Sequence, residues 1–276
     1  MAIIEALRDV GSISSYLSKC AYLRKAWIEA GDRPGEEETL WYRAQPEENL
    51  GLTPKLYRPE YRGAYEAEIR QEFQSRATQL KEGRLPQTKY DWYFLMQHYG
   101  APTRLLDWTE NPLVALYFAV RTLRDSKDNA RKYNPVVWVL NPWWLNSKLK
   151  FKNDRRVEGP ILPDWKEADR YLRDLEKAFE LDSDTAAKLP AAIEPPYVDR
   201  RIASQVSRFV IFGQARDLSK IKSARRDDCR LAKIVIQRKV RARLLDELER
   251  MGTTETNLFL DLEHLCQDIS RRWEKR

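Results

Sequence analysis

Apolar and polar residues follow two different periods along this chain. Apolar residues at helical spacing predict helices over residues 15–29, 61–80, 89–98, 113–124, 241–251 and 258–272. Runs of β-branched and aromatic residues predict strands over residues 39–45, 135–140, 208–212 and 232–236. Because these helices and strands mix without a regular strand–helix–strand rhythm, the pattern predicts an α+β fold.

Helix-capping and helix-breaking residues set several of these boundaries. Asn111 followed by Pro112 predicts a helix start, since asparagine caps helix N-termini and proline fits the first helical position. Gly100 and Pro102 end the helix over 89–98, and Gly252 ends the one over 241–251.

The pattern divides the chain into three parts. Residues 1–36 form a helical leader, and residues 37–215 form the main domain. An irregular or helical insertion occupies about residues 143–200 of that domain. Residues 216–276 form a C-terminal strand–helix–helix segment that we expect to pack on the same domain.

Composition is that of a globular protein, with 276 residues of which 42% are hydrophobic and 33% charged. The three cysteines, Cys20, Cys229 and Cys266, are scattered and lack the spacing of metal ligands, so reduced thiols and no metal site are expected. The chain has no apolar stretch of the roughly 18–20 residues that a membrane span needs, and no secretory signal pattern. We therefore expect a soluble cytoplasmic protein.

The net charge of +7 is concentrated in one part of the chain. Residues 201–250 hold 14 Lys and Arg against 6 Asp and Glu, a local net charge of +8. A basic patch of this kind attracts phosphate-rich partners such as nucleic acid. The alternative is that these side chains form the solvated faces of a strand and two helices.

The most concentrated set of polar functions lies in residues 97–109, Gln-His-Tyr-Gly-Ala-Pro-Thr-Arg-Leu-Leu-Asp-Trp-Thr. The run contains one of the two histidines of the chain, an arginine, an aspartate and several aromatic or hydroxyl groups. Core segments rarely need so many polar functions, whereas a site for a polar small molecule does. We expect the functional site here.

Four segments together resemble the FRG domain family of prokaryotes and phages, over roughly residues 37–265. They are Trp41–Gln45, Gln97–Thr109, Asn111–Ala119 and Arg201–Phe209. The family is named for a Phe-Arg-Gly motif, and this chain has Tyr42 for the phenylalanine and Ala44 for the glycine. The second segment is long and specific, and it carries most of the resemblance.

The layout is also similar to that of ADP-ribosyltransferases, which implies a mixed sheet core surrounded by helices and NAD as substrate. In that plan Arg43 lies on an early strand and orients the NAD ribose. Asp107, Trp108 and Thr109 lead into a helix, and Gln205 stands near a late strand.

The resemblance and the residue chemistry together predict four catalytic residues. Arg43 and His98 hold the ribose and phosphates, since a guanidinium fork suits a pyrophosphate and an imidazole can shuttle protons. Asp107 accepts hydrogen bonds from hydroxyl groups. Gln205, or a nearby acid such as Glu110, Glu194 or Asp199, assists glycosidic cleavage. The alternatives are an Arg43–Asp107 ion pair and a histidine that caps its helix.

Further residues are expected to contact the nucleotide. Tyr99 and Trp108 frame the nicotinamide ring, Arg104 binds a phosphate, Thr109 contacts the amide or ribose, and Tyr117 stacks on a base. Each has a structural alternative. Arg104 pairs with Asp107, Thr109 caps the next helix, and the aromatic residues belong to the core, a reading that we favour for Tyr117.

Two functions of different classes therefore remain open. The first is an ADP-ribosyltransferase-like enzyme that cleaves NAD and modifies a nucleic acid or protein acceptor, in a toxin or in phage defence. The second is a module that binds a nucleotide or nucleic acid without turning it over. A hydrolase finds little support, since the chain has no Gly-x-Ser-x-Gly elbow and no P-loop.

Overall fold

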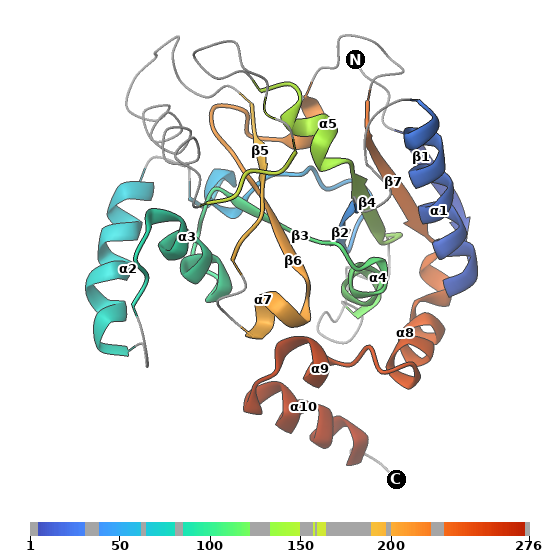
Figure 1. The fold of residues 1–276 in the computed structure, drawn as a ribbon. Coiled ribbons are helices and arrows are strands. Elements are labelled where there is room, and N and C mark those ends of the chain that lie inside the picture. Colours follow the sequence, from blue (N-terminus) through green and yellow to red (C-terminus); the bar gives the residue numbers. More distant parts are fainter. Residues whose placement is uncertain are drawn as a thin grey trace.

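The computed structural model describes residues 5–30, 39–61, 65–80, 85–121, 133–149, 157, 159–163, 189–196, 200–221 and 229–273 (Figure 1). The strands are β1 Glu5–Val10, β2 Trp41–Gln45, β3 Leu105–Thr109, β4 Val136–Leu140, β5 Ala191–Ile193, β6 Ser207–Ile211 and β7 Leu231–Ile236. The helices are α1 Ile13–Glu29, α2 Glu66–Leu80, α3 Lys89–His98, α4 Pro112–Arg121, α5 Pro142–Asn146, α7 Arg200–Ser204, α8 Arg241–Arg250, α9 Glu255–Phe259 and α10 Leu262–Trp273. Short 3-10 turns are η1 Lys55–Tyr57, η3 Leu218–Lys220 and η5 Arg238–Val240.

The predicted α+β class is confirmed, and each predicted strand and each predicted helix but one has a counterpart with shifts at its ends. Residues 62–64, predicted within the helix over 61–80, lie outside the described residues. The predicted helix over 258–272 is divided, because Leu260 adopts a left-handed conformation with φ of 53° between α9 and α10. Residues 122–124, predicted as the end of a helix, lie outside the described residues. Two strands were missed, β1 in the predicted helical leader and β5 in the predicted insertion.

Within the described residues, seven strands form one mixed sheet in the order β1-β7-β4-β2-β3-β6-β5. The outer strand β1 runs parallel to β7, and the other neighbouring pairs are antiparallel. The N-terminal segment therefore belongs to the main sheet. None of the described helices is both long and apolar enough to cross a lipid bilayer.

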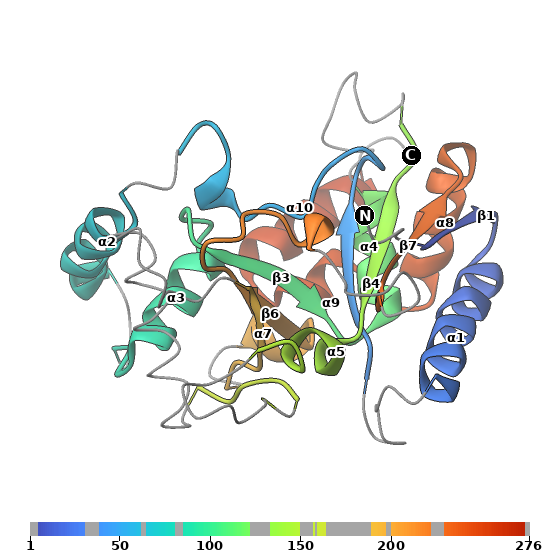
Figure 2. The same ribbon diagram turned by 90° about the horizontal axis from the view of Figure 1, so that it is seen from above.

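The sheet is interrupted at its centre. β2 and β4 pair along five residues, and β3 and β6 do the same, but β2 and β3 pair only at Tyr42 and Thr109. Figure 2 shows β3 running away from β2 at a wide angle. The sheet thus consists of two halves that join at one residue pair.

Helices cover one face of each half. α1, α4, α8 and α9 pack on the β1-β7-β4-β2 half, and α3 packs on the β3-β6-β5 half (Figures 1 and 2). The opposite face carries an aromatic-rich core that includes Trp41, Trp108, Trp138 and Trp144, covered by α5 and the loops around η1 and η3. Both faces are therefore buried, which explains the nearly continuous apolar runs of β4 and β7.

A buried ion pair ties α2 to the start of β3. Arg104 is 1% exposed, and its Nε and Nη2 donate to the carboxylate of Glu66, which is 6% exposed. Burial alone would lower the pKa of Arg104, but the adjacent Glu66 carboxylate raises this pKa above its usual value. The guanidinium of Arg104 also donates to the backbone carbonyl of Phe212 at 3.4 Å, so the ion pair lies within a buried polar cluster.

Glu66→Gln is expected to lower the free energy of unfolding by about 3–5 kcal/mol, because it removes the carboxylate that pairs with the buried guanidinium. Urea denaturation of both proteins measures the difference. Glu72→Gln is a matched control on the same helix, since its ion pair with Arg76 is exposed and is worth less than about 1 kcal/mol. Equal losses for both variants would contradict the structural role of the buried pair.

Two tyrosines surround the buried thiol of Cys20, which is 5% exposed. Burial raises the pKa of Cys20 to about 12, although hydrogen bonds with Tyr16 and Tyr42 act to lower it. Tyr16 in turn donates its hydroxyl to the carbonyl of Pro112 at the start of α4, 2.9 Å away. The cluster fastens α1 to the face of the sheet beneath β2.

We expect Cys20 to react with a thiol-specific disulfide reagent only after unfolding, because the neutral, buried thiol is not nucleophilic. Cys266 is exposed on α10 and serves as the internal standard for rapid reaction. Mass spectrometry of peptides from folded and denatured protein identifies the modified thiol. Rapid labelling of Cys20 in the folded protein would show that α1 opens away from the sheet.

Candidate functional site

A polar cavity of about 280 Å³ lies where β2 and β3 diverge. Its walls come from these two strands, from α4, from the end of α3 and from the segment around α7. The lining residues are Tyr42, Arg43, Ala44, Gln97, Asp107, Trp108, Thr109, Val114, Ala115, Phe118, Arg201, Gln205 and Ser207. The cavity brings together residues that are far apart in the chain, such as Arg43 and Arg201, which are separated by 158 positions.

Arg43 bridges the gap between the two strands. Its Nη1 donates to the backbone carbonyl of Asp107 at 2.5 Å and lies 3.6 Å from the Asp107 carboxylate. Burial lowers the pKa of Arg43, while Asp107 acts in the opposite direction. The predicted Arg43–Asp107 ion pair is therefore present. The buried Nε of Arg43 has no hydrogen-bond partner among the described residues, and such a donor is costly unless a ligand or water satisfies it.

Asp107 is held in place by a chain of side chains from the polar motif. The Nε2 of Gln97 donates to the Asp107 carboxylate at 2.8 Å. The fully buried Thr103 donates its hydroxyl to Oε1 of Gln97 and accepts from the backbone N–H of Leu105. Thr103 thus orients the amide of Gln97 so that its donor faces Asp107, whose side chain is 54% exposed.

Gln205 and Thr109 meet on the opposite side of the cavity. The Thr109 hydroxyl donates to the carbonyl of Gln205 at 2.6 Å and accepts from the N–H of Asn111 at 3.0 Å. The side chain that caps the first turn of α4 is that of Asn111, which accepts from the N–H groups of Leu113 and Val114. Thr109 instead fixes the backbone of Asn111 and also lines the cavity. The Gln205 amide donates to the carbonyl of Leu258 at 3.0 Å.

Four predicted site residues do not line this cavity, and His98 and Tyr99 are two of them. They lie at the end of α3, where their rings meet edge to face with centroids 4.8 Å apart. The backbone carbonyl of His98 accepts from Nη1 of Arg201, a lining residue of the cavity, at 3.3 Å. Tyr99 is 70% exposed and borders a separate apolar hollow between α2 and α3. Tyr99 and Arg43 therefore line different hollows, whereas both were predicted at one site.

The other two are Arg104 and Tyr117. The side chain of Arg104 is 1% exposed, pairs with Glu66 and does not line the cavity, which is not the position expected of a phosphate-binding residue there. Side chains alternate across a strand, so positions 104 and 107 face opposite sides. Tyr117 is 1% exposed and belongs to the core, as favoured. Trp108 is 3% exposed and packs mainly with the opposite, aromatic-rich core.

The proposed substitute acids lie elsewhere. Glu110 accepts from Nε of Arg208 at 2.9 Å, and Glu194 lies 3.9 Å from the same atom. Burial raises the pKa of Glu194, an effect that Arg208 opposes. Neither carboxylate lines the cavity, and Asp199 lies outside the described residues. Asp107 is consequently the only acidic side chain among the described lining residues.

Among the lining residues that were not predicted as site residues, Gln97 and Arg201 are the ones whose side chains carry polar or charged groups with contacts at the cavity. Both belong to segments that carry the family resemblance, so the signal was present in the motif. What the motif could not show is the direction of each side chain. Among the described residues, no three His, Cys, Asp or Glu side chains lie close enough together to hold a metal ion.

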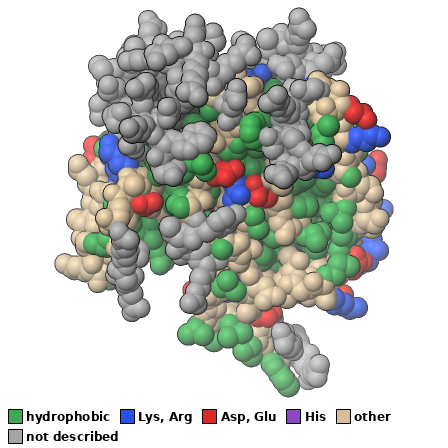
Figure 3. Space-filling model, in the orientation of Figure 1, with side chains coloured by type: hydrophobic (Ala, Val, Ile, Leu, Met, Phe, Trp, Pro, Cys, Tyr) green, Lys and Arg blue, Asp and Glu red, His purple; other side chains and the backbone are tan. Residues whose placement is uncertain are grey.

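The basic segment 201–250 is not one uniform surface. Arg208, Arg230 and Arg241 are each no more than 8% exposed. Burial lowers the pKa of Arg241, which donates to backbone carbonyls of Pro46 and Ala119. On the face drawn in Figure 3, basic side chains are dispersed and lie beside acidic ones. Within the described residues, three of the 14 basic side chains of this segment are therefore buried inside the molecule.

Comparison with known proteins identifies the class of this domain. Residues 38–128 match the model of the FRG domain, so the chain contains an FRG domain, as its motifs predicted. No curated protein and no solved structure matches the chain significantly. The matched range includes Arg43, Gln97 and Asp107, whereas Arg201 and Gln205 lie beyond it.

The turn that presents Gln205 is strained. Val206 adopts φ of 46°, a left-handed conformation that a β-branched residue rarely takes. Its carbonyl accepts from the N–H of Glu110 at 3.2 Å, and the adjacent Gln205 carbonyl accepts from Thr109. These two bonds from the end of β3 hold the turn against its own preference.

Val206→Asn is expected to raise the free energy of unfolding by about 1 kcal/mol, because asparagine enters the left-handed region at lower cost. Denaturant unfolding checks this value. Val206→Ala is the matched control, since it removes side-chain atoms without making the left-handed conformation as accessible. A loss of stability in the asparagine variant equal to that in the alanine variant would contradict the assignment of strain.

Proposed function

We propose that the protein is an ADP-ribosyltransferase-like enzyme that cleaves NAD at the cavity between β2 and β3. One observation carries the proposal. Arg43, Asp107 and Gln205, which lie far apart in the sequence, line the same polar cavity. Its volume of about 280 Å³ is close to the lower end of small-molecule pockets and matches one ring-and-ribose unit better than a whole dinucleotide. The adenosine part of NAD would extend out of the cavity.

The reaction breaks the glycosidic bond between the ribose C1′ and the nicotinamide nitrogen. Nicotinamide leaves with the bonding electron pair, and positive charge develops on the ribose. The acceptor nucleophile then attacks C1′ and releases its proton. A carboxylate beside the ribose stabilises the developing charge, and Asp107 is the carboxylate that the described lining residues provide.

Arg43 supports the binding half of this proposal. Its guanidinium is fixed by the Asp107 carbonyl, and its Nε is a buried donor without a partner among the described residues. A phosphate or ribose oxygen at this position would satisfy that donor through a charge-assisted hydrogen bond. Gln97 would act through Asp107 by fixing the orientation of the carboxylate.

Gln205 takes a supporting role in this arrangement. Its amide is oriented by the carbonyl of Leu258, so it contributes polarity and shape to the cavity wall. The acceptor remains a nucleic acid or a protein in the proposal. Cleavage of a central metabolite such as NAD suits a toxin or a phage-defence protein.

A nucleotide-binding module without turnover is the second candidate, and one observation favours it. Apart from Asp107, the described lining residues offer no acidic side chain, and Asp107 is already engaged by Arg43 and Gln97. Saturable nucleotide binding without any released nicotinamide would identify this function.

Incubation of the full chain with NAD and acceptor candidates, followed by chromatography, is expected to detect free nicotinamide. Arg43→Ala is expected to lower kcat/KM for this release by at least about 100-fold, the effect of removing one transition-state contact. The same variant should weaken NAD binding only about tenfold. Arg8→Ala is the control, since Arg8 is an exposed arginine paired with Glu48 away from the cavity.

The outcomes separate the two candidates. If Arg43→Ala lowers release and binding by the same factor, the arginine acts in binding alone. If the wild-type chain releases no nicotinamide with protein, DNA or RNA present as acceptor, the enzyme proposal fails and the binding module remains.

A further inference from the structure

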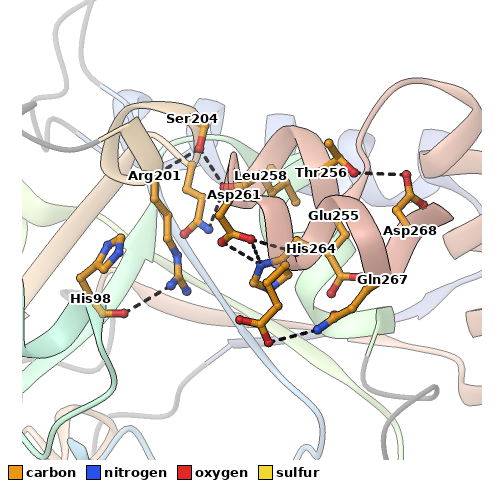
Figure 4. Close-up of polar contacts among 12 residues, drawn as sticks. His98, Arg201, Ser204, Glu255, Thr256, Leu258, Asp261, His264, Gln267 and Asp268 are labelled. Atoms are coloured by element: carbon orange, nitrogen blue, oxygen red, sulfur yellow. Dashed lines mark hydrogen bonds and ion pairs between the residues drawn. The ribbon is translucent and has the colours of Figure 1, made fainter. Parts of the chain in front are cut away.

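The C-terminal helices α9 and α10 lie beside α7 and contact the residues that close the cavity (Figures 1 and 4). The carbonyl of Leu258 accepts two side-chain hydrogen bonds, from the hydroxyl of Ser204 at 2.8 Å and from the amide of Gln205 at 3.0 Å. One backbone group of α9 thus fixes the end of α7 and a lining side chain of the cavity.

The side chain of Arg201 also contacts α9, through the ring of Phe259. The central guanidinium carbon of Arg201 lies 4.4 Å from the centre of the Phe259 ring, within the range of a cation–π interaction. Its Nη1 donates to the carbonyl of His98. Figure 4 shows Arg201 extending from α7 between His98 on one side and the α9–α10 segment on the other.

The Phe259 ring is itself held in place by a stacked imidazole. The imidazole of His264 stacks on the Phe259 ring with 3.8 Å between centroids and 3° between planes. Asp261 contacts Nδ1 of His264 at 2.7 Å and fixes the imidazole. The pKa of Asp261 is lowered mainly by the backbone N–H of His264, with smaller contributions from the imidazole and from Arg201. Three side chains, Phe259, His264 and Asp261, together with the carbonyl of His98, therefore help to fix the position of the guanidinium.

The charged side chains that line the cavity carry a net positive charge. The described lining residues include two cations, Arg43 and Arg201, and one anion, Asp107. A net positive cavity attracts anions. Stacking uses the flat face of a guanidinium, whereas its N–H donors lie in the plane and point along the edge, the geometry that suits phosphate oxygens.

We propose that Arg201 is a second anion-binding side chain of the cavity, specific for a pyrophosphate group, and that residues 255–264 hold it in place through Phe259. The inference deepens the proposed function, on which it rests for the identity of the whole ligand. It also assigns a functional role to a segment beyond the FRG match over residues 38–128. Phe259 is a positioning residue, because it acts through Arg201.

The test is calorimetric titration of the full chain with inorganic pyrophosphate and with NAD at several salt concentrations. Arg201→Gln is expected to weaken pyrophosphate binding at least about tenfold, a typical loss for one charge-assisted contact. It should also flatten the salt dependence of binding, since one charge is removed. A merely structural residue would leave that slope unchanged.

Variants of Phe259 test the positioning role. Phe259→Leu removes the aromatic face and is expected to weaken pyrophosphate binding about fivefold, whereas Phe259→Tyr keeps the face and should restore binding to within about twofold. Phe259 also contacts Arg121 and Phe118, so thermal unfolding must show that each variant is folded at the titration temperature. Leu262→Ser is the matched control, since Leu262 begins α10 and is 78% exposed.

Each result decides one of the two proposals. Pyrophosphate binding that is equal in wild type and Arg201→Gln overturns the inference, and nicotinamide release by the same wild-type protein would leave the proposed function standing. Equal weakening by Phe259→Leu and Phe259→Tyr overturns the positioning role. Pyrophosphate binding that depends on Arg201, without NAD cleavage, supports the inference and rejects the enzyme. Failure of wild type to bind pyrophosphate overturns the inference.

Discussion

The interrupted pairing between β2 and β3 is the constraint on which the cavity depends. Neighbouring strands normally satisfy each other's N–H and C=O groups, but here the ladder stops after Tyr42 and Thr109. Beyond that pair the guanidinium of Arg43 replaces the missing strand contact by donating to the carbonyl of Asp107. An arginine is suited to this position, because its several donors can serve the backbone and still face a hollow. The guanidinium thus satisfies a backbone carbonyl that the interrupted ladder leaves without a strand partner.

The polar motif of residues 97–109 supplies both the surface of this opening and its support. Gln97 and Asp107 line the cavity, whereas Thr103 and Arg104 are buried behind it and fasten the segment to its surroundings. Glu66, from α2, provides the counter-charge. The density of polar residues in this motif therefore has two causes, and only one of them is contact with a ligand. The buried pair keeps β3 rigid at the point where its neighbour on one side is missing.

How far the sequence predicts the structure depends on the distance over which each signal acts. Caps and breakers act locally, so Asn111 and Gly100 marked helix ends correctly. β1 was missed because it is a mostly exposed outer strand, without the apolar alternation that marks a half-buried one. Arg104 was assigned to Asp107 because sequence proximity hides a partner 38 positions away in α2. The convergence of Arg43, Asp107 and Gln205 was predicted, since the motifs were specific, but the directions of His98 and Tyr99 depend on tertiary packing.

The count of basic residues over 201–250 does not by itself predict an exposed basic surface. A count of basic residues treats each as exposed, yet Arg208 and Arg241 are buried and satisfy carboxylate or carbonyl groups inside the molecule. The charged side chains that can meet a ligand are those that line the cavity, Arg43, Asp107 and Arg201. They come from two separate parts of the chain. The FRG match holds Arg43 and Asp107, while Arg201 and Gln205 come from beyond it. The matched range alone would therefore form an incomplete wall, and the C-terminal helices complete the site by fixing its far side.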